Sequence, residues 1–156
     1  MRVPSDVCAC ATARHVARLL TQLYDRCLRK TGIEAPQFAL MVVLDKQAAR
    51  NQAAICRHCA MDKTTVSRNL RRLQRKGWVT ATRGDDRRER HYALTPAGRK
   101  RLTAGWPAWR RAQAQLRAVM TDDEWAAMFE MFQTLTTAAH AAHRKAIGGM
   151  TVTRPR

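Results

Sequence analysis

The segment TTVSRNLRRLQRKGW, residues 64–78, combines short hydroxyl side chains with a series of arginines. Val66, Leu70 and Leu73 are spaced four and three residues apart, which predicts the apolar face of a helix. The side chains expected on the opposite face are those of Thr64, Thr65, Ser67, Arg68, Arg71 and Arg72. Hydroxyls and first-turn amides bind phosphate, and arginine donates two hydrogen bonds to guanine in a major groove. The pattern indicates a helix that binds DNA; the alternative is an ordinary solvated charged face.

A second arginine-rich stretch follows, in a turn between two predicted strands. Its basic residues are Arg83, Arg87, Arg88 and Arg90. An arginine at such a tip can enter a minor groove while a nearby carboxylate holds its guanidinium. We predict that Arg88 does so with Asp86 as its holder, or Arg87 with Asp85 in the neighbouring frame. A solvent-exposed turn with balanced charges is the other interpretation.

After the arginines, the cysteines are the second set of residues whose side chains could carry a function. The chain has five, which as an odd number argues against a framework built only of disulfides. Arg14 lies one helical turn after Cys10, and its charge would favour the nucleophilic thiolate. Cys8 would serve as a resolving thiol or second soft ligand only if the N-terminus is frayed, because positions i and i+2 face apart in a regular helix. Alternatively, Cys10 is a small buried residue.

Metal ligation has weaker support. Cys56 and Cys59 form a C-x-x-C, but no second pair follows at a zinc-finger spacing, so we predict that both pack in the core, as does Cys27. His140 and His143 would need a third ligand from a partner helix, or else are surface histidines. We therefore predict no cofactor and no firm metal site, with Cys8, Cys10, His140 and His143 as weak candidates.

The overall charge points to a polyanionic partner. The 156 residues include 29 Lys and Arg against 12 Asp and Glu, a formal charge of +17. Such an excess favours nucleic acid. No apolar stretch approaches the roughly 18–20 residues that span a bilayer, and the first residues lack the apolar region of a secretory signal. We expect a cytoplasmic protein without a membrane partner, whose thiols are reduced.

Periodicity predicts the elements that must position these residues. A stripe at helical spacing runs from Cys10 to Cys27, Gly32 ends it, and Pro36 opens a second helix. Further helices are predicted over 51–59, after Asp62 as N-cap, after Thr95-Pro96 and after the capping box that Thr121 starts. Strands are predicted over 78–82 and 91–94. Pro107 should kink or split the helix that contains it.

This order predicts a mainly α fold with a small β-hairpin wing, that is, a winged helix-turn-helix flanked by helices. Apolar stripes on the first and last helices, far apart in sequence, suggest a dimer interface. We expect an N-terminal dimerisation helix over 1–35, the DNA-binding domain over 36–95 and C-terminal dimerisation helices over 96–147. The basic tail 148–156 is expected to be disordered.

The sequence resembles the MarR family of bacterial regulators. MDKTTVSRNLRRLQRKGWV at 61–79 is similar to the recognition helix of that family, and DDRRERHYALTPAGRKRL at 85–102 to its wing and the helix that follows. The resemblance implies a homodimer that reads a pseudo-palindromic operator in double-stranded DNA. It also implies a repressor, released from the operator by an effector.

The first helix is similar to that of the MarR-type organic-hydroperoxide sensors. Cys10 lies fourteen residues before Tyr24, the spacing of the reactive cysteine and a tyrosine in those sensors, where tyrosines of the other subunit activate the cysteine. Fourteen helical residues span roughly 21 Å, so Cys10 and Tyr24 of one chain cannot touch. Arg14 and Ala35 stand where two further tyrosines would be. The effector is then an oxidant, an electrophile or a thiophilic metal or metalloid, sensed through Cys8, Cys10, Arg14 and Tyr24.

Other functions remain open at this point. Trp106, Trp109, Trp125, Phe129 and Phe132 either line a pocket for a small aromatic effector or belong to the core. A sequence-independent architectural protein would use only the charge. We expect no enzyme, because we find no Gly-rich phosphate loop, carboxylate pair or nucleophile–base set.

Overall fold

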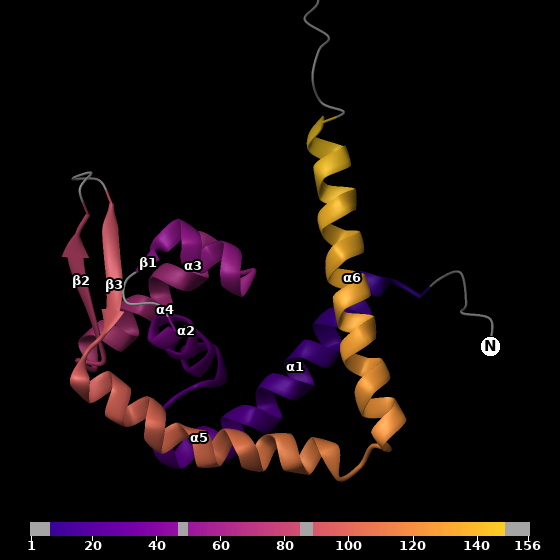
Figure 1. Ribbon diagram of the computed structural model, residues 1–156, viewed down its shortest axis with the longest axis horizontal. Helices are drawn as coiled ribbons and strands as arrows, with labels where there is room; N and C mark the ends of the chain where they lie inside the picture. The colour runs from indigo at the N-terminus through magenta and orange to yellow at the C-terminus, as the bar shows by residue number, and fades with distance from the viewer. Residues whose placement is uncertain (1–6, 47–49, 85–88, 149–156) are drawn as a thin grey trace, which may run out of the picture. The chain divides into compact units, whose positions relative to one another are not determined.

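The computed structural model describes residues 7–46, 50–84 and 89–148 (Figure 1). Contacts within the chain divide it into two compact units, Met1–Gln113 and Ala114–Arg156. The first unit contains the whole helix-turn-helix and its wing. None of the helices in the described residues is long and apolar enough to cross a membrane.

The fold is mainly α with a small wing, as predicted. Its helices are α1 (Ala9–Leu28), α2 (Ala35–Lys46), α3 (Gln52–Cys59), α4 (Lys63–Arg75), α5 (Pro96–Arg117) and α6 (Asp122–Gly148), and a short 3-10 turn at Arg29–Thr31 follows α1. The strands are β1 (Arg50–Asn51), β2 (Val79–Arg83) and β3 (Arg90–Leu94). The predicted helix and strand ranges are confirmed within a few residues.

The wing is a three-stranded antiparallel sheet in the order β1-β3-β2 (Figure 1). In the β2–β3 hairpin, Val79 lies opposite Leu94 and Arg83 opposite Arg90. Strand β1, which pairs with β3, was not predicted, because two residues are too short to show the alternation that identifies a strand. The pairing ties the start of α3 to the wing.

The core of the first unit lies around α2. Leu40 and Met41 of this helix are fully buried, and Phe38 and Leu44 nearly so. A helix that is apolar on most of its sides must be covered on most of them. The residues that cover it include Leu28, Ile33, Ile55, Val66, Leu70, Leu73, Leu102 and Ala108. The apolar face predicted for α4 is therefore confirmed as its buried face.

Three predicted helix caps are present. Asp62 Oδ1 accepts a hydrogen bond from the Thr65 amide at 2.8 Å at the start of α4. Thr95 Oγ1 accepts one from the Gly98 amide at 3.0 Å at the start of α5. At the start of α6, Thr121 and Glu124 bond reciprocally at 2.8 and 3.2 Å, which is the arrangement of a capping box.

Pro107 does not split its helix. It lies inside α5, which is continuous from Pro96 to Arg117. Leu102, Gly105, Ala108 and Ala112 are buried at helical spacing on both sides of the proline. We attribute the continuity to this packing, which offsets the roughly 3 kcal/mol that an interior proline costs.

Candidate nucleic-acid interface

The outward side of α4 forms a shallow basic groove. Arg68 and Arg71 are exposed, whereas Val66 and Leu73 on the opposite side are fully buried. The groove has a volume of about 740 Å3 and is lined by Gln52, Lys63, Thr64, Ser67, Arg68, Arg71 and Arg75, which we call the basic face. The structure thus brings Thr64, Ser67, Arg68 and Arg71 together. Sequence reasoning missed Gln52, Lys63 and Arg75, although Lys63 and Arg75 flank the predicted residues on the same helix.

Thr65 has a different role from its neighbours. Its hydroxyl donates a hydrogen bond to Asp62 Oδ2 at 2.6 Å, and its amide donates to Oδ1 of the same carboxylate. These two bonds hold the pKa of Asp62 below its ordinary value. Thr65 therefore helps to start α4 rather than lining the basic face.

We expect this cap to make stability depend on pH in the acid range. The lowered pKa of Asp62 means that its contribution is present above the pKa of the unfolded chain and is lost as pH falls through the native pKa. Asp62→Asn keeps an acceptor but removes the charge. The difference in Tm between wild type and variant should shrink between about pH 7 and about pH 3. A constant difference would show that the charge of Asp62 has no such role.

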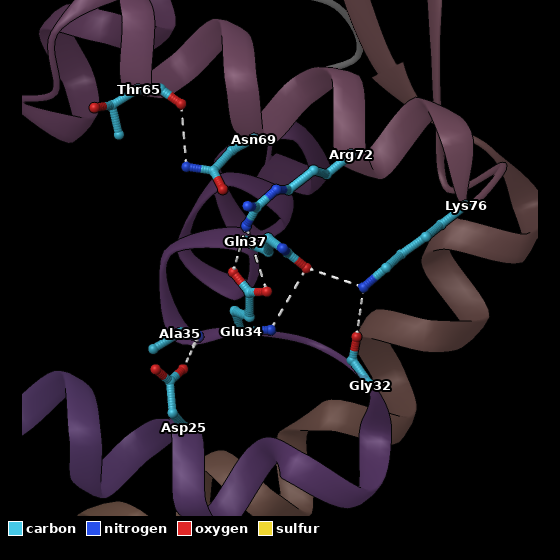
Figure 2. A network of polar contacts seen from close by, with 9 residues as sticks. All are labelled: Asp25, Gly32, Glu34, Ala35, Gln37, Thr65, Asn69, Arg72 and Lys76. Atoms are coloured by element: carbon cyan, nitrogen blue, oxygen red, sulfur yellow. Dashed lines mark hydrogen bonds and ion pairs between the residues drawn. The ribbon is translucent and has the colours of Figure 1, made fainter.

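Arg72 also lies apart from the basic face. Its Nη1 is 3.1 Å from Glu34 Oε2, just before α2 (Figure 2). The helical period explains this placement: Arg72 precedes the buried Leu73 and falls on the flank of α4, together with Thr65 and Lys76. The side chain of Arg72 is 42% exposed and its guanidinium is paired within the first unit, and its contact with DNA stays a prediction.

A second groove adjoins the basic face beside the wing. It has a volume of about 570 Å3 and is lined by Asn51, Gln52, Ala53, Cys56, Arg57, Lys63, Glu89, Arg90 and Tyr92. Gln52 and Lys63 line both grooves. The basic surface is therefore continuous from α4 to the predicted wing residue Arg90.

The wing places two like charges opposite each other. Arg83 and Arg90 are paired across the β2–β3 hairpin, and both are exposed. Like charges in this position destabilise a hairpin unless an anion lies between them. Asn51 Nδ2 donates to Glu89 Oε1 at 3.0 Å, which joins the residue before β3 to the start of α3. Asp86, Arg87 and Arg88 lie outside the described residues, and their contacts stay predictions.

The N-terminal cysteines are both exposed, and they differ in backbone conformation. Cys8 is the N-cap residue of α1 with extended dihedrals (φ −82°, ψ 112°), whereas Cys10 lies in the first turn. The helix end is not frayed, because the Cys8 carbonyl accepts a hydrogen bond from the Thr12 amide at 3.0 Å, so a Cys8–Cys10 pair stays a prediction. Arg14 is exposed one turn further along α1. Tyr24 lies elsewhere, half-buried near the other end of the helix.

The other cysteines and the histidines form no metal site in the described residues. Cys56 and Cys59 pack against the core, as predicted, and Cys27 is half-buried on α1. His140 and His143 are exposed on α6. Among the described residues, no group of three His, Cys, Asp or Glu side chains is placed to hold a metal ion.

An apolar cavity of about 600 Å3 lies between α1, α2 and α5. It is lined by Tyr24, Leu28, Ala35, Phe38, Ala39, Val42, Lys46, Trp106 and Trp109, and we call it the aromatic cavity. Burial raises the pKa of the Tyr24 phenol, and Cys27 acts in the same direction, so the hydroxyl is protonated at neutral pH. Trp106 and Trp109 line this cavity and also pack against the core, so both interpretations apply to them. Trp125, Phe129 and Phe132 instead form a series of edge-to-face rings on α6, in the second unit.

A helix-turn-helix with a β-hairpin wing and a continuous basic face defines a winged-helix DNA-binding protein. Comparison with known proteins agrees. The model of the MarR family matches residues 31–89. The chain is 25% identical to the HTH-type transcriptional regulator YwoH of Bacillus subtilis over 117 residues, 75% of this chain and 85% of YwoH.

Solved structures extend the match over most of the chain. The transcriptional regulator MosR of M. tuberculosis, in a crystal structure with DNA, is 34% identical and has a TM-score of 0.79, with 87% of this chain and 98% of MosR covered. PcaV of Streptomyces coelicolor shares the fold, with a TM-score of 0.77 at 21% identity over 89% of this chain and 99% of PcaV. The chain belongs to the MarR family of DNA-binding transcriptional regulators.

Proposed function

We propose that this regulator is a dimeric repressor that binds a pseudo-palindromic operator and is released by oxidation of Cys10. The observation that carries the DNA-binding part is the basic face of α4. Arg68 and Arg71 would contact bases in the major groove, because they are exposed arginines of the basic face in the middle of α4. MosR, the 34% identical regulator, was crystallised with DNA, which supports DNA as the partner of this chain.

Backbone contacts would come from the edges of the basic surface. Lys63, Thr64 and Ser67 lie at the start of α4, where hydroxyl and ammonium groups suit phosphate. Arg83 and Arg90, opposed across the hairpin, would be relieved of their mutual repulsion by the DNA backbone or a narrow minor groove. These contacts position the protein, whereas Arg68 and Arg71 would provide specificity.

The dimer would form through the helices outside the DNA-binding domain. Leu19 on α1 is 52% exposed, and Phe129, Met131, Phe132 and Leu135 on α6 are 40–57% exposed. Such a series of large apolar side chains is unfavourable in water and indicates a partner surface. We infer that a second copy covers them. Residues 1–35 and 96–147 would then be dimerisation segments, and two copies of α4 would read two half-sites.

The proposed switch is thiol oxidation by an organic hydroperoxide. The Cys10 thiolate attacks the distal peroxide oxygen and forms a sulfenic acid, and the peroxide leaves as an alcohol after taking up a proton. The Cys8 thiol then displaces water from the sulfenic acid, which forms a disulfide. Cys8 lies before the helix and Cys10 within it, so closing this bond would distort the first turn of α1. A cytoplasmic location would keep the Cys8 and Cys10 thiols reduced in the resting state.

Replacing Cys10 by serine tests the switch. DNA binding is followed by fluorescence anisotropy on the upstream region of the gene at fixed salt, before and after cumene hydroperoxide. The reduced wild type and Cys10→Ser should bind equally, and oxidation should weaken only the wild type, by about tenfold or more. Cys27→Ser is the matched control and should behave like wild type. If Cys10→Ser is released as readily as wild type, Cys10 is not the sensor.

A second candidate effector is a small aromatic acid. The aromatic cavity supports it, because an apolar pocket with a few polar groups suits a compact ring, and Lys46 offers a cation for a carboxylate. Release of both wild type and Cys10→Ser by salicylate, with no effect of the hydroperoxide, would favour this candidate over thiol oxidation.

A further inference from the structure

The groove beside the wing, which we call the wing groove, is lined by three basic side chains. Arg57 belongs to α3, Lys63 to the start of α4 and Arg90 to β3. All three are exposed, and no side chain in the ranges 7–46, 50–84 and 89–148 forms an ion pair with them. A cleft lined mainly by charges of one sign attracts the opposite charge from solution.

Basic residues outside the two grooves show that exposure alone does not leave a cation unpaired. Arg99 Nη1 donates to Leu94 O at 2.9 Å, and Arg101 Nη1 donates to Thr31 O at 3.2 Å. Both arginines are exposed, yet both bind a carbonyl of their own chain. The unpaired cations of the wing groove therefore need an explanation of their own.

Among the described residues that line the wing groove, Glu89 carries the only carboxylate, and it pairs with none of the three cations. Its Oε1 accepts a hydrogen bond from Asn51 Nδ2 at 3.0 Å, and its Oε2 lies 3.4 Å from His91 Nε2. A free carboxylate in this groove would pair with an arginine or lysine, because hydrogen bonds between two charged groups are the stronger ones. The hydrogen bond from Asn51 therefore keeps Glu89 from neutralising the groove.

The rim between the wing groove and the basic face is held in place by a hydrogen bond. Gln52 Nε2 donates to Lys63 O at 3.0 Å and so joins the start of α3 to the start of α4. Both residues line the two grooves. With α4 in a major groove and the wing at the adjacent minor groove, a single sugar-phosphate strand separates these two grooves of the DNA. That strand would cross the rim and enter the wing groove.

We propose that the wing groove binds a backbone phosphate of this strand, with Arg57 and Lys63 as its contacts. Helix α3 then touches DNA directly, through Arg57, in addition to supporting α4. Glu89 is a positioning residue, because its hydrogen bond with Asn51 leaves the two cations free for the phosphate. The proposal rests on the proposed function, since it supposes that α4 lies in a major groove.

The test neutralises single phosphates of the operator. A methylphosphonate linkage replaces one backbone phosphate at a time, and affinity is measured by anisotropy at fixed salt for wild type and Arg57→Met. The arginine is exposed, so the variant should fold, which thermal unfolding checks. At one linkage in each half-site, neutralisation should weaken binding of the wild type about tenfold and that of Arg57→Met less than about twofold.

Arg110→Met is the matched control for Arg57→Met. Arg110 is exposed on α5 and lines neither groove, so the variant removes the same charge at a distance. It should show the wild-type loss at every linkage. The phosphate site would be overturned if Arg57→Met responded to each linkage as wild type does, or if Arg110→Met lost the same response. Failure of the wild type to prefer its operator over random duplex would instead remove the proposed function.

Asn51→Ser tests the role of Glu89. Serine keeps a cap for α3, where Asn51 Oδ1 accepts from the Ala54 amide, but removes the Nδ2 donor. The carboxylate of Glu89 then turns to the cations, and affinity for the operator should fall by up to about fivefold, the strength of an exposed ion pair. In the Glu89→Gln background the same substitution should have no effect. Equal effects in both backgrounds would contradict the positioning role of Glu89.

Discussion

Replacement of Arg71 by alanine is expected to reduce the preference for the operator over random duplex by roughly 1–3 kcal/mol, the free energy of one bidentate base contact. Arg71 is exposed on the basic face of α4, and its guanidinium has no partner among the described residues. It is therefore available to a guanine edge. Affinity for random duplex should fall much less, because that affinity depends on the phosphate contacts.

Arg110→Ala is the control for charge alone. Arg110 is exposed on α5 and does not line either basic groove. The variant removes the same charge, so it should weaken binding to operator and random duplex to the same small extent. The contact assigned to Arg71 would be refuted if Arg71→Ala kept full discrimination against mismatched operators at matched salt.

Replacement of Gly98 by alanine is expected to destabilise the fold by about 1–3 kcal/mol or more, the range found for overpacked cores. A Cβ at Gly98 would overlap the carbonyl oxygen of Trp78, a backbone atom. This oxygen also accepts a hydrogen bond from the Thr95 amide at 3.0 Å, so it cannot retreat without loosening the start of α5. Tm from thermal unfolding measures the effect.

The sign of the effect separates packing from helix propensity. Helix propensity alone would make a helix interior about 1 kcal/mol more stable with alanine than with glycine. Ala97→Gly, at the exposed neighbouring position, changes only propensity and should cost at most about that much. A Tm for Gly98→Ala equal to or above that of wild type would show that α5 does not approach Trp78 this closely.

Most of the fold could be predicted from signals between residues that are close together in the sequence. The caps at Asp62, Thr95 and Thr121 were predictable because a cap depends on residues three positions apart. The buried face of α4 was predictable because Val66, Leu70 and Leu73 repeat at the helical period. The basic face followed from the same period, since it lies opposite that apolar repeat.

Features that depend on distant residues were not predictable. The pairing of Arg72 with Glu34 joins positions 38 residues apart, and nothing near Arg72 distinguishes it from Arg71. Strand β1 exists only because β3 provides a partner for two residues. The aromatic cavity needs α1, α2 and α5 together, so sequence reasoning grouped Trp106 and Trp109 with aromatic residues of α6.

Specific DNA binding through the basic face is the central claim, and one anisotropy measurement tests it most directly. Wild type is titrated against the upstream DNA of its own gene and against a shuffled duplex of the same length and composition, at several salt concentrations. We predict binding to the upstream DNA at least about a thousandfold tighter near physiological salt, the lower limit for specific binding. Equal affinities with the same steep salt dependence would contradict the account and indicate a protein that binds nucleic acid by charge alone.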